Sequence, residues 1–110
     1  MSLADTRCVP CRGGIPALTR EEIAPYLEQV EHWQLSEQAN HIHRDFTFPD
    51  FRTALTFVNH VGELAETMGH HPEIRFGWGH AHIEIWTHKI GGLHENDFVL
   101  AARIDQLPEG

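Results

Sequence analysis

The segment HAHIEIWT, residues 80–87, alternates strictly between two kinds of side chain. Ala81, Ile83 and Ile85 point to one side of an extended strand, and the histidine, glutamate and tryptophan side chains between them point to the other. Such alternation is typical of a sheet that is covered on one face only. The rest of the chain must therefore supply the elements that bury the apolar face.

Three segments have the apolar spacing of a helix that packs on one side. Thr19 begins a capping-box pattern, T-R-E-E, that predicts a helix over about 20–31. The strongest apolar stripe starts after a candidate N-cap, Asp50, and continues to Gly69, a residue type that ends helices in the left-handed conformation. A last helix is expected over about 94–107.

The strands lie between these helices in pairs. A short strand around 33–35 and a longer one around 42–48 read as a hairpin, and so do the segments 74–78 and 80–87. The order of elements is therefore α-β-β-α-β-β-α. It predicts an α+β fold, with a four-stranded antiparallel sheet and three helices packed on one face.

Length and charge limit both the organisation and the partners. With 110 residues, we expect an irregular arm over 1–18 and a single domain over 19–110. The net charge of −8 leaves no basic stripe for nucleic acid. No apolar run reaches the roughly 20 residues of a membrane span, and the N-terminal segment lacks the apolar core of a signal peptide. We expect a cytoplasmic protein without nucleic-acid or membrane partners.

Cys8 and Cys11 form an isolated C-x-x-C motif in the turn-rich arm. Two thiols do not complete a tetrahedral zinc site, and a redox role would need the motif between a strand and a helix. A reduced pair without a function is the simplest interpretation, and a disulfide or metal role stays an alternative.

Ten histidines invite both metal and acid–base hypotheses. His41 and His43 share one strand face, as do His80 and His82, and such pairs can chelate a metal. No cysteine or carboxylate completes a site at a firm spacing, so we expect no metal and interpret these side chains as solvated or interface histidines.

Two adjacent histidines follow the expected end of the second helix. Pro72 favours an extended conformation for His71, and successive side chains on extended backbone point to opposite sides. His70 and His71 are therefore expected to reach different partners. A helix end followed by a stiff turn suits preorganised acid–base groups, although a histidine at a helix C-terminus also gains from the helix dipole without any catalytic role.

Other polar residues fall at the ends of neighbouring elements. His88 comes at the end of the fourth strand, Glu66 lies one turn before His70, and Asp97 falls in the first turn of the last helix. Three imidazoles and two carboxylates at element ends could line one cleft.

These residues and their spacing resemble the pterin-4a-carbinolamine dehydratase family, and the similarity extends over roughly residues 19–107. The family pattern is an acidic residue, three residues, His-His-Pro, five residues, an aromatic residue, nine residues, His, and then Asp after eight or more. The matching residues are Glu66, His70, His71, Pro72, Trp78, His88 and Asp97.

The resemblance implies a four-stranded antiparallel sheet with three helices on one face, in dimers or tetramers. It also implies elimination of water from a 4a-hydroxytetrahydropterin, such as 4a-hydroxytetrahydrobiopterin, to give the quinonoid dihydropterin, with neither metal nor organic cofactor. This reaction returns the spent cofactor of aromatic amino acid hydroxylases toward reduction, so a functional link to such a hydroxylase is implied as well.

By position, the resemblance makes His70 and His88 the acid–base pair, and His71 a third catalytic group that mainly binds and orients the pterin. The remaining implied substrate-binding residues are Glu66, Pro72, Trp86, Thr87, Lys89 and Asp97. The alternative is a non-catalytic dehydratase-like module that serves as a dimerisation cofactor or assembly chaperone. Such a module is expected to lose acid–base histidines, and all three are present here.

Overall fold

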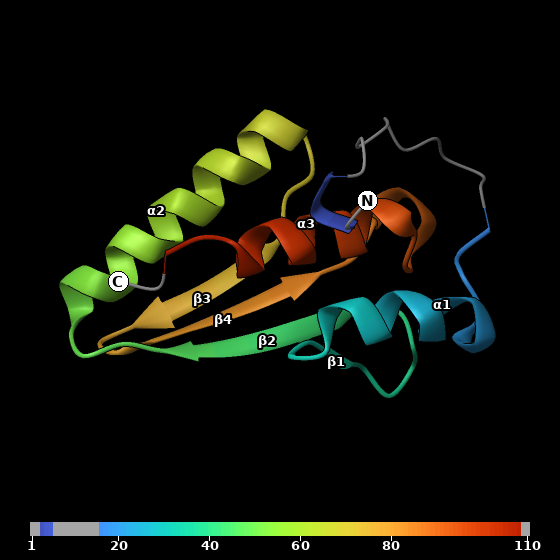
Figure 1. Ribbon diagram of the computed structural model, residues 1–110, viewed down its shortest axis with the longest axis horizontal. Coiled ribbons are helices and arrows are strands. Elements are labelled where there is room, and N and C mark those ends of the chain that lie inside the picture. The colour runs from blue at the N-terminus through green and yellow to red at the C-terminus, as the bar shows by residue number, and fades with distance from the viewer. Residues whose placement is uncertain (1–2, 6–15, 109–110) are drawn as a thin grey trace.

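The computed structural model describes residues 3–5 and 16–108 (Figure 1). Three helices alternate with two pairs of strands, in the order predicted from the sequence. The helices are α1 (Arg20–Leu27), α2 (Phe51–Met68) and α3 (Glu95–Asp105), and the strands are β1 (Gln34–Leu35), β2 (Ile42–Thr47), β3 (Glu73–Gly77) and β4 (His80–Ile85). Three short 3-10 turns lie at Leu3–Asp5, Glu28–Val30 and His88–Ile90.

The four strands form one antiparallel sheet in the order β1-β2-β4-β3. Each hairpin contributes two neighbours, and the hairpins join through β2 and β4, which pair from Ile42 opposite Ile85 to Thr47 opposite His80. This central pairing connects segments that are far apart in the sequence. The predicted α+β fold is confirmed.

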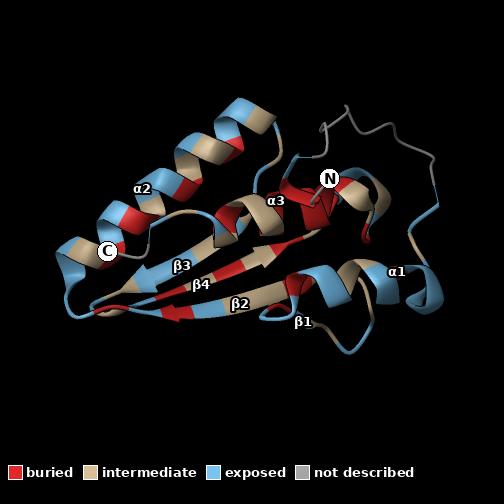
Figure 2. Cartoon of the chain, in the orientation of Figure 1, coloured by how far each residue is buried: buried red, intermediate tan, exposed pale blue. Residues whose placement is uncertain are grey.

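One hydrophobic core joins the apolar face of the sheet to the helices. Ile83 and Ile85 of β4 are fully buried there, and the buried residues of α2 lie along one side of that helix (Figure 2). The ring centroid of Phe57 lies 4.6 Å from that of Phe46 and 5.2 Å from that of Phe48. Each fully buried side chain of this size stabilises the fold by about 1.5–3 kcal/mol, so the alternation in β4 determines which side the helices cover.

The ends of the helices follow from local chemistry. The Asp50 carboxylate accepts a hydrogen bond of 2.8 Å from the Thr53 amide, and Gly69 ends α2 with φ of 66°. Thr19 and Glu22 form the predicted capping box. Beyond Leu27 the chain tightens into a 3-10 turn, so the first helix is shorter than the predicted 20–31.

The last strand also ends earlier than predicted. β4 stops at Ile85, because Thr87 turns away from the neighbouring strand and forms an isolated bridge with Gly92. His88 consequently lies in the 3-10 turn that follows, not within the sheet. This turn carries the chain from the sheet to the start of α3.

Part of the predicted N-terminal arm is visible. Leu3 is buried in the core, and the Arg103 Nε atom donates a hydrogen bond of 2.9 Å to the carbonyl of Ala4. Cys8 and Cys11 lie outside the described residues. Among the helices that the structure describes, none has the length and apolar content to cross a membrane.

The second face of the sheet is polar. The imidazole of His82 lies between two carboxylates, with Nδ1 2.7 Å from Asp45 and Nε2 3.1 Å from Glu84. Partial burial alone lowers the pKa of His82, but these two hydrogen bonds reverse the effect and hold that pKa above its ordinary value. Partial burial likewise raises the pKa of Glu84, and hydrogen bonds from His41 and His82 bring it below its usual value.

Candidate active site

A buried carboxylate connects three segments at one end of the sheet. Asp97, in the first turn of α3, is 0% exposed. Its Oδ1 lies 2.6 Å from Nε2 of His70, which follows the end of α2. Its Oδ2 accepts hydrogen bonds from the Thr87 hydroxyl at 2.7 Å and from the backbone N–H of His94 at 2.8 Å. Asp97 therefore caps its own helix and links it to α2 and to the segment after β4.

The contacts of Asp97 determine which nitrogen of His70 carries a proton. An ionised carboxylate only accepts hydrogen bonds, and Asp97 already accepts two at Oδ2. His70 therefore donates from Nε2–H, which leaves Nδ1 as the nitrogen with a lone pair in the neutral ring. The His70 side chain is 11% exposed, so only a small part of the ring can meet a ligand.

The neighbouring His71 has a different environment. Its Nε2 donates to Oε2 of Glu66 at 2.5 Å, and its side chain is 60% exposed. Gly69 in the left-handed conformation stops the helix immediately before the pair, and Pro72 follows it. His70 thus turns toward α3, whereas His71 turns back along the exposed side of α2.

His88 belongs to a column of stacked rings. Its ring centroid lies 4.4 Å from that of Trp86, with an interplanar angle of 4°. On its other side Trp86 stacks on His41 at 4.0 Å and 15°. This column holds the exposed His88 ring at the end of the sheet.

Hydrogen bonds link His70, Thr87 and Asp97, and the chain places His88 next to Thr87. Thr87, which binds Asp97, is the residue between Trp86 and His88, so His70 and His88 are connected through Asp97 and Thr87. Glu66 and His71 form a second pair. Pro72 is half-buried where the chain enters β3, and Lys89 is exposed in the 3-10 turn after β4.

The sequence suggested His41 only as a possible chelating partner of His43, and its contact with Trp86 was not predicted. His41 precedes β2, and it reaches Trp86 because Ile42 pairs with Ile85 across the centre of the sheet. The spacing within either hairpin carries no information on this pairing. A histidine next to the second strand was visible in the sequence, but its partner was not.

A groove beside the Glu66–His71 pair has a volume of about 790 Å³, within the range of sites for small organic ligands. It runs along α2 and β3. Its lining residues are Val58, Asn59, Gly62, Glu63, Glu66, Thr67 and Ile74. Glu66 connects the groove to His71 through their hydrogen bond, and none of the three histidines predicted as catalytic lines it.

The chain is similar to known proteins over most of its length. Residues 16–107 match the family described as pterin 4 alpha carbinolamine dehydratase. A Methylococcus capsulatus protein whose name assigns it provisionally to the pterin-4-alpha-carbinolamine dehydratases is 51% identical over 106 residues, which cover 96% of this chain and 93% of that protein.

Solved structures are also similar. A Brucella melitensis protein described as a transcriptional coactivator/pterin dehydratase has a TM-score of 0.76 and 30% identity, over 81% of this chain and 95% of that one. A pterin dehydratase-like protein described as a RuBisCO assembly factor in the alpha-carboxysome has a TM-score of 0.58 over 66% of this chain and 84% of that one. At 24% identity, this second likeness concerns the fold alone. The family match and the half-identical relative together show that the chain belongs to the pterin-4-alpha-carbinolamine dehydratase family.

Proposed function

We propose that this protein is a hydro-lyase that eliminates water from a 4a-hydroxytetrahydropterin, such as 4a-hydroxytetrahydrobiopterin, to give the quinonoid dihydropterin. Membership of the family supports the reaction class. The observation that carries the assignment to this site is the buried Asp97, which binds His70 and, through Thr87, holds the segment that bears His88.

The reaction needs two proton transfers. One proton reaches the 4a-hydroxyl oxygen, whose bond to C4a then breaks and releases water, and another leaves N5 of the ring, whose electrons form the new double bond to C4a. Imidazole suits both roles, because its unperturbed pKa allows one copy to donate and another to accept near neutral pH. No oxidant, reductant or metal enters this balance.

The contacts favour a division of roles between His70 and His88. With Nε2–H committed to Asp97, the neutral His70 ring has a lone pair at Nδ1, which suits removal of the N5 proton. His88 is more exposed and stacks on Trp86, which suits protonation of the leaving hydroxyl. The exposed His71–Glu66 pair would bind the polar edge of the pterin, and Trp86, Thr87, Lys89 and Pro72 complete the proposed substrate-binding residues.

The test of this proposal is the rate of carbinolamine dehydration by the native protein, measured by stopped flow after a hydroxylase generates the substrate. Acceleration over the uncatalysed reaction is expected, and absence of any acceleration would contradict the proposal.

The cytoplasmic location and the link to an aromatic amino acid hydroxylase belong to the same proposal. Cell fractionation tests the location. Loss of pterin-cofactor recycling for the hydroxylase in a deletion strain tests the functional link.

The proposal includes a homodimer or homotetramer. Phe51 and Phe76 stack at 5.7 Å on the surface, and Leu55 lies one turn along α2. Trp78, two residues after Phe76, is 70% exposed. Exposed apolar groups of this kind are typical of interaction sites. We expect sedimentation to show an oligomer at micromolar concentration that Leu55→Lys weakens, and a native monomer would exclude this part of the proposal.

A protein-binding role is the second candidate function. The description of the Brucella melitensis structure combines a coactivator with a dehydratase, and the exposed apolar residues around Phe51 offer a surface for a partner. This role can coexist with catalysis because the surface includes none of the three proposed catalytic histidines. It becomes the principal role if the native protein fails to accelerate dehydration.

A further inference from the structure

The polar face of the sheet gathers metal-binding side chains that the dehydratase reaction does not use. His43 and Asp45 are two positions apart on β2 and therefore lie on the same face of the sheet. Asp45 pairs directly with His82 on β4. One donor atom from each of the three residues lies within 4.8 Å of the other two. We propose that His43, Asp45 and His82, here called the sheet-face triad, bind a divalent transition-metal ion.

The register of the sheet explains why these residues meet. Residues i and i+2 of a strand project from the same face, and the diagonal neighbour across an antiparallel pair is within reach of long side chains. His43 and His82 are such a diagonal pair, and their ring centroids are 5.6 Å apart with an interplanar angle of 28°. The sequence shows only the histidine pairs within one strand, whereas the triad forms across two strands.

The distances between the donor atoms need only small adjustments to hold a metal ion. Two ligands at about 2.1 Å from a tetrahedral zinc ion are about 3.4 Å apart. The His82 Nδ1 to Asp45 Oδ1 distance of 2.7 Å has to open by about 0.7 Å, which the 74% exposed Asp45 side chain allows. The other donor distances, which are at most 4.8 Å, have to contract by at most about 1.4 Å, and side-chain rotation on an open face provides this.

The two nitrogens of His82 have complementary partners. Nδ1 faces Asp45, while Nε2 faces Glu84 at 3.1 Å. A neutral imidazole has one N–H and can donate to only one of two flanking carboxylates. A metal ion at Nδ1 replaces the proton on the Asp45 side and leaves Nε2–H to donate to Glu84. A carboxylate behind a metal-binding histidine in this way orients the ring and raises its basicity.

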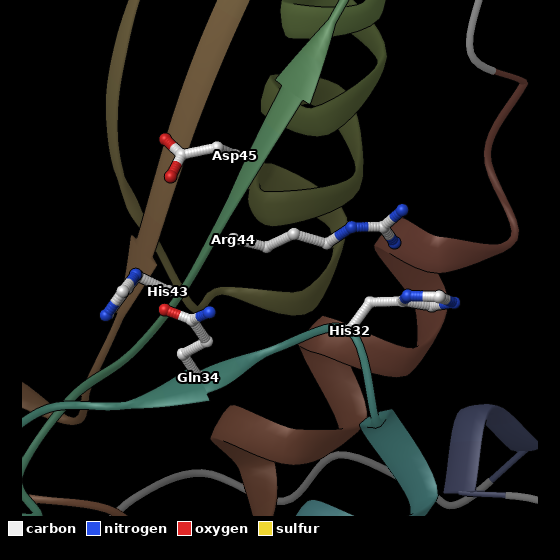
Figure 3. Close-up of a pocket in the computed structure, with 5 residues that line it drawn as sticks. All are labelled: His32, Gln34, His43, Arg44 and Asp45. Carbon is white, nitrogen blue, oxygen red and sulfur yellow. The ribbon is translucent and has the colours of Figure 1, made fainter.

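The Asp45 and Glu84 carboxylates beside His82 also fit a cation. His43 and Asp45 project to the same side of β2, opposite to Arg44 (Figure 3). Together with His32, Gln34 and Arg44 they line a hollow of about 280 Å³, and His82 is not one of its lining residues. Arg75, 4.0 Å from Glu84, opposes a cation, but its side chain is 75% exposed and can move away.

The ligand set indicates the class of ion. Two imidazoles and one carboxylate suit zinc, nickel, cobalt or copper, whereas magnesium and calcium prefer oxygen ligands alone. Zinc is the natural probe because it is redox-inactive and accepts three protein ligands with water in the remaining position. The triad lies apart from His70 and Asp97, so this inference does not depend on the proposed dehydratase reaction.

The test is a calorimetric titration of Zn²⁺ into the full-length chain with Cys8→Ser and Cys11→Ser, which removes competing thiols. We expect saturable binding of a single ion per chain. In the same background, His43→Ala and His82→Ala should each weaken binding by at least about tenfold. His60→Ala, at an exposed histidine on α2, is the matched control and should leave the affinity unchanged.

Asp45→Ala is the second variant if a histidine variant fails to fold, because the Asp45 side chain is mostly exposed. In a parallel measurement, Co²⁺ should broaden the ring signals of His43 and His82 in the NMR spectrum before those of His70, His71 and His88. Absence of saturable zinc binding, native affinity in the triad variants, or earlier broadening of the candidate active-site histidines would overturn the proposal.

Discussion

The Nε2 atom of His70 lies 2.6 Å from Oδ1 of Asp97, although 27 positions separate the two residues in the sequence. The carboxylate is fully buried and has two further donors, the Thr87 hydroxyl and the His94 amide. Its position is thus determined before any substrate arrives, and the orientation of the His70 ring follows from it. This contact connects the stability of the fold to the proposed chemistry.

Replacement of Asp97 should affect both the stability of the fold and the rate of the proposed reaction. Asp97→Asn keeps the shape but removes the anionic acceptor, so we expect the free energy of unfolding to fall by about 1–3 kcal/mol. Turnover should fall by no more than the contribution of one proton-transfer group, about 10²–10⁴-fold. In ¹⁵N NMR spectra, the His70 ring should change from the Nε2–H tautomer to a mixture.

Asp105→Asn is the matched control for this change. Asp105 also lies on α3 and accepts hydrogen bonds of 2.9 Å from the Trp33 indole and 2.6 Å from Arg44. Its replacement should destabilise the fold without any change in the His70 tautomer. An unchanged tautomer in the Asp97 variant would show that Asp97 does not orient His70.

The stack of Trp86 on His88 predicts a positioning effect. Aromatic pairs of this kind contribute about 0.5–1.5 kcal/mol beyond area burial, and a loss of 1.36 kcal/mol corresponds to a tenfold change in rate. Trp86→Leu should therefore lower kcat by up to about tenfold, and Trp86→Phe should restore most of the loss. Steady-state kinetics that give the two variants the same kcat would exclude a role for ring stacking.

The exposed pair of His71 and Glu66 should act mainly on binding. A hydrogen bond of this type contributes about 0.5–1.5 kcal/mol, so His71→Ala should raise the dissociation constant of a pterin product analogue by roughly 2- to 10-fold. Titration followed by pterin fluorescence measures this constant. His60→Ala, on the helix that precedes His71, provides the control. An unchanged constant for the His71 variant would remove this residue from the binding site.

Local features of the fold were predictable because their causes lie within a few residues. Asp50 caps α2 through the Thr53 amide, and Gly69 ends the helix in the left-handed conformation, as their positions in the sequence indicated. The alternation in β4 likewise predicted which of its faces is buried. These signals depend on neighbouring residues alone.

Features that depend on the central pairing of β2 with β4 could not be predicted in this way. That pairing places Asp45 opposite His82 and brings His41 to Trp86, and no spacing within a hairpin encodes it. The contact of His70 with Asp97 is similar, because it depends on how α3 packs against the end of α2. The resemblance to the family named His70, Trp86 and Asp97 as site residues, and the structure shows their partners.

The N-cap of α2 predicts a specific response to acid. Hydrogen bonds from Thr53 lower the pKa of Asp50, and the bond from the Thr53 side chain contributes more than the bond from its backbone N–H. Because this pKa is lower in the folded state than in the unfolded state, its stabilisation is present above the unfolded pKa and is lost as the pH falls through the folded pKa.

Asp50→Asn isolates this effect, since asparagine caps helices without titrating. We expect the stability difference between the native protein and the variant to be constant near neutral pH and to change only below about pH 4, in favour of the variant. Chemical denaturation at a series of pH values measures this difference. A difference independent of pH down to pH 2 would show that Asp50 makes no charged cap.

The central claim is that His70 and His88 transfer protons to and from one bound pterin. The most direct measurement is stopped-flow dehydration of hydroxylase-generated carbinolamine by the native protein and by His70→Ala, His88→Ala and His60→Ala. We predict that the first two variants remain folded by circular dichroism and lose a factor of about 10² or more in turnover, while the third keeps native turnover. Native turnover in either the His70 or the His88 variant would contradict the claim.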